Sequence, residues 1–231
     1  MTAVRSNNRF AIIPWALAVI ALSAALLVRP AAANSQELAS YVDDNTQKLV
    51  QRLNQESDLY TDDPDAFYEE MEQALSGFVD FRRIAARVMG RYARQATPEQ
   101  RDEFVVRFKR SLFESYAQAL VNNSDGFEIA VREAQINPRD EDRASVDMMV
   151  TTEAGDRYQV TYSMYRNKDS GDWLMENVIV EGVNIGLAFR DRFAQEMESR
   201  RGDVDAVIEN WGEAVASLNL DEEMDQGADG E

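Results

Sequence analysis

The stretch FVDFRRIAARVMGRYARQATPEQRDEFVVRFKRSLFESYAQAL, Phe78–Leu120, contains two amphipathic helices with clear boundaries. In the first helix, apolar residues recur three and four positions apart from Phe81 to Met89, which is the period of one helix face. Asp80 stands before this face as an N-cap, and Gly90 stands after it as a C-terminal stop. The pattern predicts a short helix that buries one side.

The second helix of this stretch begins at Thr97 and Pro98. The Thr97 side chain can cap the helix, Pro98 suits its first turn, and Gln100 stands where a capping-box partner is needed. One side of this helix is apolar and rich in aromatic rings, with Phe104, Val105, Phe108, Leu112, Tyr116 and Leu120. The two helices therefore form a broad apolar wall, which needs a second surface to pack against.

The chain that follows this wall has the pattern of β-strands. The segments with strand character are 127–136, 144–152, 157–166 and 172–182. Short connections rich in Gly, Asn, Asp and Pro separate them, which is typical of an antiparallel meander. Apolar side chains alternate in the two middle segments, at Val146, Met148 and Val150, then at Tyr158, Val160, Tyr162 and Met164. The sheet is expected to cover one face and to leave the other in solvent.

Helical segments are expected both before and after the strands along the sequence. The helical segments outside the opening stretch are 36–59, 64–75, 184–200 and a last helix that Asp203 caps. Helices before and after a run of strands predict one α+β domain, with the helices packed on the covered face of a four-stranded antiparallel sheet. This domain is expected to span residues 34–218, and the acidic, nearly apolar-free segment 219–231 is expected to be a disordered tail.

Composition excludes several function classes. The 231 residues include no histidine and no cysteine, and the net charge is −18. These absences remove the commonest general base, the commonest metal ligand and the thiol nucleophile. No catalytic motif, metal site or cofactor site is recognisable, and a strongly acidic chain is a poor partner for nucleic acid.

The N-terminus has the form of an export signal. Arg5 and Arg9 precede an apolar run from Phe10 to Val28, and small residues lead to an Ala31-x-Ala33 cleavage pattern. We expect residues 1–33 to be a cleaved signal peptide and the domain to lie in a bacterial periplasm. An uncleaved inner-membrane anchor is the alternative, because the run of 19 apolar positions is just long enough to span.

Basic residues are concentrated in the opening stretch. Nine Arg and Lys residues lie within the 29 positions from Arg82 to Arg110. Arg83, Arg87 and Arg91 are candidates for docking to anionic partners, although solvated helix faces paired with Asp and Glu would have the same composition.

Several short motifs give the chain a family resemblance. These are V-D-F at Val79–Phe81, G-R-Y at Gly90–Tyr92, A-T-P-E-Q at Ala96–Gln100, V-E-G-V at Val180–Val183 and F-R at Phe189–Arg190. In this order, behind an export signal, they resemble the MlaC-type phospholipid-binding proteins, also called the toluene-tolerance auxiliary family. The chain departs from the usual pattern after G-R-Y, where it has Ala93 and Arg94.

The resemblance implies a non-enzymatic carrier. Its fold would be α+β, with a curved sheet and helices that enclose an apolar cavity in the manner of an NTF2-like cone. Its ligand would be a glycerophospholipid, and it would shuttle lipid between an outer-membrane lipoprotein–porin complex and an inner-membrane ABC transporter with an MCE-domain subunit, which maintains outer-membrane lipid asymmetry. An NTF2-like enzyme and an interaction module of the cell envelope remain the alternatives.

An acyl-chain cavity needs dry and adaptable walls. The residues predicted to line it are Ile84, Val88, Phe104, Phe108, Leu112, Val146, Met148, Val150, Val160, Tyr162, Met164 and Trp173. The flexible side chains of Met89 and Met175 suit the same role, although ordinary core packing is the simpler interpretation of these methionines. Headgroups are expected to stay near the mouth, in solvent.

Overall fold

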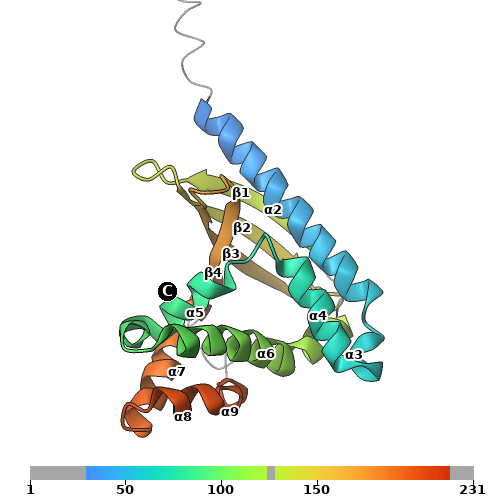
Figure 1. Cartoon of the computed structure of the whole chain (residues 1–231). Coiled ribbons are helices and arrows are strands. Elements are labelled where there is room, and N and C mark those ends of the chain that lie inside the picture. Colours follow the sequence, from blue (N-terminus) through green and yellow to red (C-terminus); the bar gives the residue numbers. More distant parts are fainter. Residues whose placement is uncertain (1–29, 124–127, 219–231) are drawn as a thin grey trace, which may run out of the picture.

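The computed structural model describes residues 30–123 and 128–218, and Figure 1 shows a sheet with helices arranged around it. The helices are α2 (Pro30–Gln55), α3 (Leu59–Asp62), α4 (Pro64–Leu75), α5 (Phe81–Met89), the 3-10 helix η1 (Gly90–Arg94), α6 (Pro98–Asn123), α7 (Ile185–Ser199), α8 (Val204–Glu209) and α9 (Trp211–Ala216). The strands are β1 (Glu128–Ile136), β2 (Arg143–Thr151), β3 (Arg157–Arg166), β4 (Trp173–Val180) and β5 (Val183–Asn184).

The predicted helix boundaries of the opening stretch are confirmed. The Asp80 carboxylate accepts a hydrogen bond from the backbone N–H of Arg83 at 2.9 Å, and Gly90 ends α5 with a φ of 53°. Thr97 and Gln100 form a reciprocal capping box, with N···O distances of 2.9 and 3.2 Å. Local side-chain chemistry therefore sets where α5 and α6 begin.

The sheet is antiparallel throughout, in the order β1-β2-β3-β4-β5, and it is curved and unclosed. Val146 lies opposite Tyr162, and Met148 lies opposite Val160, so the predicted apolar alternation forms one continuous face. The α+β prediction is confirmed, with one correction to the strand count of four. Glu181 and Gly182 both have positive φ, the geometry of a two-residue hairpin turn, and they add the short strand β5 beside β4.

Two packing clusters hold the helices and the sheet together. Leu38 and Val42 of α2 pack on the apolar face of the sheet against Val146 and Met148. The second cluster is helical, and Trp211 is fully buried at its centre. In Figure 1, α2 runs diagonally across the sheet, while α7, α8 and α9 lie on the far side of α6 from it.

Two helical segments differ from the sequence prediction. The first expected helix begins earlier, at Pro30, and it is divided at residues 56–58 into α2 and α3. The last one is divided at Asn210, whose side-chain amide donates to the carbonyl of Ala206 at 2.8 Å and so ends α8. The expected tail and nearly all of the expected signal peptide lie outside the described residues.

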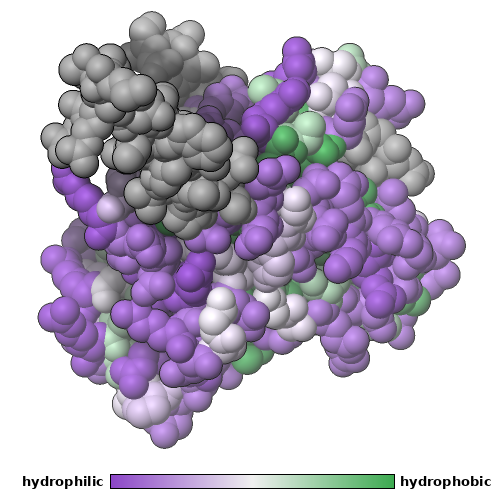
Figure 2. Space-filling view, turned by 90° about the horizontal axis from the view of Figure 1, so that it is seen from above, coloured by the Kyte–Doolittle hydropathy of each residue, from purple (hydrophilic) through white to green (hydrophobic). Residues whose placement is uncertain are grey.

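Polar side chains dominate the face shown in Figure 2, where hydrophobic residues form only small, separated patches. Among the described residues, none of the helices has both the length and the apolar character that a membrane crossing requires.

Candidate functional site

An apolar cavity lies between the sheet and the helices α5, α6 and α7. Its volume is about 320 Å³. Its wall consists of Leu49, Leu75, Val79, Phe81, Ile84, Phe108, Leu112, Phe113, Tyr116, Tyr162, Met175, Asn177, Val178, Ile185, Gly186 and Phe189. Two strands, five helices and the loop residue Val79 therefore meet around one hollow.

The cavity wall is made almost entirely of hydrocarbon. Asn177 supplies an amide, and its side-chain oxygen already accepts the backbone N–H of Gly186 at 3.1 Å. A tyrosine hydroxyl is already neutral at physiological pH, and burial raises the pKa of Tyr162 further. A wall of this kind suits an apolar ligand and offers little to a charged one.

The segment before α5 is joined directly to the sheet beside the cavity. The backbone N–H of Asp80 donates to the carbonyl of Met175 at 3.1 Å, and the N–H of Met175 donates to Phe78 at 2.8 Å. This pair of bonds makes a short parallel bridge between Val79 and β4. It fixes the distance between α5 and the sheet, which is where Ile84 enters the wall.

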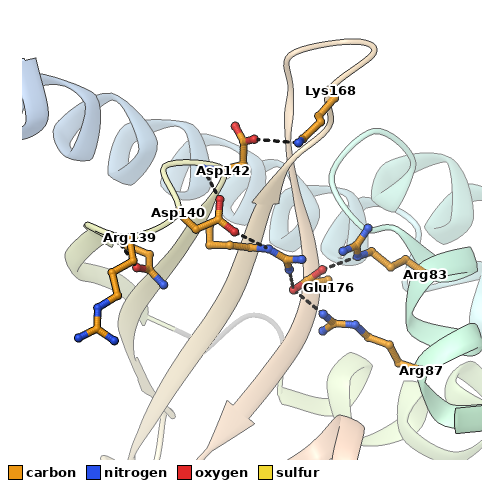
Figure 3. A network of polar contacts seen from close by, with 9 residues as sticks. Arg83, Arg87, Arg139, Asp140, Asp142, Lys168 and Glu176 are labelled. Carbon is orange, nitrogen blue, oxygen red and sulfur yellow. Dashed lines mark hydrogen bonds and ion pairs between the residues drawn. The ribbon is translucent and has the colours of Figure 1, made fainter.

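A cluster of charged groups lies where α5 meets β4, as Figure 3 shows. The Glu176 side chain is only 5% exposed, and three guanidinium groups surround it. Arg83 approaches one carboxylate oxygen at 2.5 Å, and Arg87 approaches the other at 2.9 Å. Arg143 of β2 is the third partner. The three pairs satisfy a buried carboxylate that would otherwise be costly.

The same cluster includes a tyrosine. The Tyr165 hydroxyl donates to the carboxylate of Asp80, and Arg83 stacks over the Tyr165 ring with its guanidinium carbon 4.0 Å from the ring centre. Burial and the hydrogen bond to Asp80 raise the pKa of Tyr165 to about 12. The N-cap of α5 is thereby tied to β3.

The MlaC family model matches residues 43–213 of this chain. The chain belongs to the MlaC family. This MlaC-family chain is 38% identical over 177 residues to the toluene tolerance protein Ttg2D of Pseudomonas putida, which covers 76% of this chain and 80% of that protein. It also shares its fold with a phospholipid-binding protein from Ralstonia solanacearum, solved in complex with a phospholipid. That match has a TM-score of 0.67 and 23% identity, and it covers 78% of this chain and 97% of that one.

Four of the predicted cavity residues line the apolar cavity of this MlaC-family chain. They are Ile84, Phe108, Leu112 and Tyr162. Met175, expected from its flexible side chain, also lines it. These five contribute from α5, α6, β3 and β4.

The other predicted cavity residues lie in the packing around the cavity. Val88, Phe104 and Met89 are buried in the helical cluster. The sheet residues pack in the cluster with α2, and they are Val146, Met148, Val150, Val160, Met164 and Trp173. Leu38 and Val42 of α2 pack against this part of the apolar face, and Leu49 of the same helix lines the cavity beside β3 and β4.

Several lining residues were missed in the sequence prediction. Phe81, Tyr116 and Phe189 stood on helix faces already identified as apolar, and Val178 stood on a strand with apolar residues. The helical or strand period of these apolar residues predicts that their side chains are buried. Gly186 and Asn177 had no such signal, because their place in the wall depends on tertiary contact.

The candidate docking residues do not form one free surface. Arg83 and Arg87 turn toward Glu176, with side chains 35% and 47% exposed. Arg91 is 71% exposed, donates to the Tyr92 hydroxyl at 2.6 Å and lies 3.8 Å from Glu198. Docking through these residues stays a prediction. Among the described residues, no group of three or more Asp or Glu side chains is arranged to hold a metal ion.

Proposed function

We propose that this MlaC-family protein is a lipid carrier that holds phospholipid acyl chains in the apolar cavity. One observation carries this proposal: a hollow of about 320 Å³ has a wall with almost no free polar group. Exposure of an acyl chain to water costs roughly 0.8 kcal/mol of free energy per methylene, and burial in a dry pocket removes that cost. The phospholipid bound by the Ralstonia solanacearum relative supports the same ligand class.

The cavity adapts to its ligand by moving its walls. Small-molecule sites commonly measure roughly 300–1,000 Å³, so this cavity is at the small end and a two-chain lipid requires it to widen. Met175 can change rotamer at low cost, and Phe113 and Tyr116 are only partly buried on α6. These side chains are the part of the wall that yields when a lipid enters.

We infer the cellular role from family membership and from the N-terminal sequence. The carrier works in the periplasm and shuttles lipid between an outer-membrane lipoprotein–porin complex and an inner-membrane ABC transporter with an MCE-domain subunit, maintaining outer-membrane lipid asymmetry. The MlaC family match and the basic, apolar and small-residue pattern of the leader support this role. The carrier performs no catalysis, which agrees with a sequence that has no histidine and no cysteine.

The proposal is tested by filling the cavity. In Leu112→Trp the larger ring takes up space that the acyl chains need, and we expect phospholipid recovered by organic extraction of the purified protein to fall at least about tenfold. Val106→Trp is the matched control, because Val106 lies on the same helix with 56% of its surface exposed. Circular dichroism verifies that both variants are folded. If folded Leu112→Trp retains the wild-type lipid content, the acyl chains lie elsewhere.

A further inference from the structure

A second hollow adjoins the apolar cavity, and its lining combines apolar residues with charged and amide side chains. We call it the polar pocket, because its charged groups distinguish it from the apolar cavity. This polar pocket measures about 590 Å³ and is lined by residues of α5, β4 and α7. Ile84, Asn177 and Gly186 line both hollows, so the two share one wall. On the side away from the acyl-chain cavity, Arg87 and Arg190 are the two cationic groups of the lining.

We propose that the polar pocket binds the phosphate of the lipid headgroup through Arg87 and Arg190. This inference rests on the proposed lipid-carrier function and extends it to the headgroup. Guanidinium groups present N–H donors in a planar fork that matches phosphate oxygens, and such charge-assisted bonds are stronger than neutral ones. A lipid with its chains in the apolar cavity places its phosphate across the shared wall.

The charges of the neighbouring cluster leave cationic capacity for an anion. Glu176 is the carboxylate in the pocket lining, and it is shared among the guanidinium groups of Arg83, Arg87 and Arg143. Within the pocket lining itself, Arg87 and Arg190 stand against the single carboxylate of Glu176, which leaves an excess of one positive charge. Arg87 keeps a 47% exposed side chain while bound to Glu176, so its remaining donors reach solvent. In a chain with a net charge of −18, such a local excess of positive charge favours a negatively charged ligand.

Arg190 is positioned by the glycine of the G-R-Y motif. A Cβ atom at Gly90 would lie 3.5 Å from Cγ of Arg190, so the arginine stem rests directly against the backbone there. Its guanidinium contacts Asp191 at 3.4 Å, and its side chain is 53% exposed. A weak, exposed pair of this kind competes little with a phosphate.

At one point of the shared wall, Gly186 and Asn177 are in direct contact, so the wall is closed there. Gly186 has no side chain there, and a Cβ atom on it would lie 2.3 Å from the side-chain oxygen of Asn177. That oxygen accepts the Gly186 N–H at the same point. Only glycine fits between the two hollows without displacing the Asn177 amide.

The experiment compares two soluble lipids that differ only in the phosphate. Delipidated protein is titrated with dihexanoyl phosphatidic acid and with dihexanoylglycerol by calorimetry. We expect wild type to bind phosphatidic acid at least about tenfold more tightly, and Arg190→Gln to lose about tenfold in that affinity while binding dihexanoylglycerol unchanged. Arg82→Gln is the control, because it removes the same charge from an exposed α5 side chain outside the pocket lining and should behave as wild type.

Each outcome identifies which proposal fails. If wild type binds neither lipid, the carrier function itself is overturned. If wild type binds both lipids alike, or if Arg190→Gln weakens both equally, the carrier stands and the phosphate site is overturned. Inorganic phosphate is titrated in parallel: we expect it to bind far more weakly than phosphatidic acid. If inorganic phosphate binds as tightly as phosphatidic acid, and if that affinity depends on Arg190, the pocket is a free-phosphate site and the headgroup assignment is overturned.

Discussion

Glu176 shows how a single buried carboxylate can organise the charges around a binding site. Its side chain is 5% exposed, and it draws Arg83 and Arg87 of α5 and Arg143 of β2 to one point on β4. A buried charge without partners would cost several kcal/mol, so the arrangement stabilises the junction of helix and sheet. It also gathers arginines beside the polar pocket. The same residue therefore serves packing and the proposed recognition of an anion.

Tyr165 gives a prediction at the residue scale. Its folded-state pKa of about 12 lies above the ordinary value of 10.0, because burial and the hydrogen bond to Asp80 favour the protonated phenol. The folded protein therefore holds this proton more tightly than the unfolded chain does. The resulting stability is complete below about pH 10 and is lost as the pH rises toward about 12.

The variant Tyr165→Phe isolates this contribution. Tyr41, Tyr68 and Tyr162 also have raised pKa values through burial, so the wild-type protein loses stability in alkali for several reasons. The difference in the free energy of unfolding between wild type and Tyr165→Phe should shrink between about pH 10 and about pH 12, as measured by urea denaturation. A difference that stays constant over this range would contradict the assignment.

Helix α6 separates two roles along its length. Near its start, Phe104 is fully buried, with its ring centre 5.0 Å from that of Phe193 and 5.2 Å from that of Trp211. Further along, Leu112 and Phe113 line the apolar cavity. One amphipathic helix thus connects a close-packed aromatic core to the cavity that we propose as the acyl-chain site.

This division predicts opposite effects for two phenylalanine variants on α6. Phe104→Ala should lower the free energy of unfolding by about 3–5 kcal/mol, because it opens a cavity in a close-packed core. The lipid bound per folded molecule should stay near the wild-type level. Phe113→Ala should cost less, because Phe113 is only partly buried, and it should change the amount of lipid bound. Urea denaturation and lipid extraction measure the two quantities.

If Phe104→Ala proves too unstable to purify, Phe104→Leu tests the same point with a smaller loss of volume. Loss of lipid from folded Phe104→Leu, together with an unchanged lipid content in Phe113→Ala, would reverse the roles that we assign to the two ends of α6.

Local signals in the sequence predict the elements well and the cavity only in part. The capping box at Thr97 and Gln100 and the alternation through Val146 and Tyr162 act over a few residues, so they can be recognised without tertiary structure. Which part of the apolar face stays uncovered is a different kind of question. It depends on where α2 crosses the sheet. The alternation of apolar residues along a strand is the same whether a helix covers them or they line a cavity.

The environment of Glu176 shows the same limit for charged residues. Arg83 and Arg87 are four residues apart, which places them on one side of α5. The spacing is compatible with a solvated face, with a docking patch and with two ligands of one buried carboxylate. The partner on β4 is 93 residues from Arg83, so only the folded chain distinguishes among the three.

At the scale of the whole molecule, the chain combines an acidic exterior with an apolar interior that is not full. The net charge of −18 and the largely polar face in Figure 2 disfavour non-specific association with anionic membrane surfaces. The cavity of about 320 Å³ deprives its lining of packing partners. On the proposed function, a bound acyl chain would supply those missing contacts, and ligand binding would then be coupled to folding stability.

This coupling predicts that lipid raises the melting temperature of the delipidated protein. A ligand at about 100 times its dissociation constant stabilises the native state by about 2.7 kcal/mol, which in a domain of this size raises Tm by roughly 5–10 °C. Scanning calorimetry with dihexanoyl phosphatidic acid, kept below its micelle concentration, measures the shift. Leu112→Trp should show almost no shift, because its cavity is already filled, while Val106→Trp should follow wild type. An equal shift in wild type and Leu112→Trp would place the stabilising contact outside the cavity, since a ligand can stabilise the fold only through a site that it occupies in the native state.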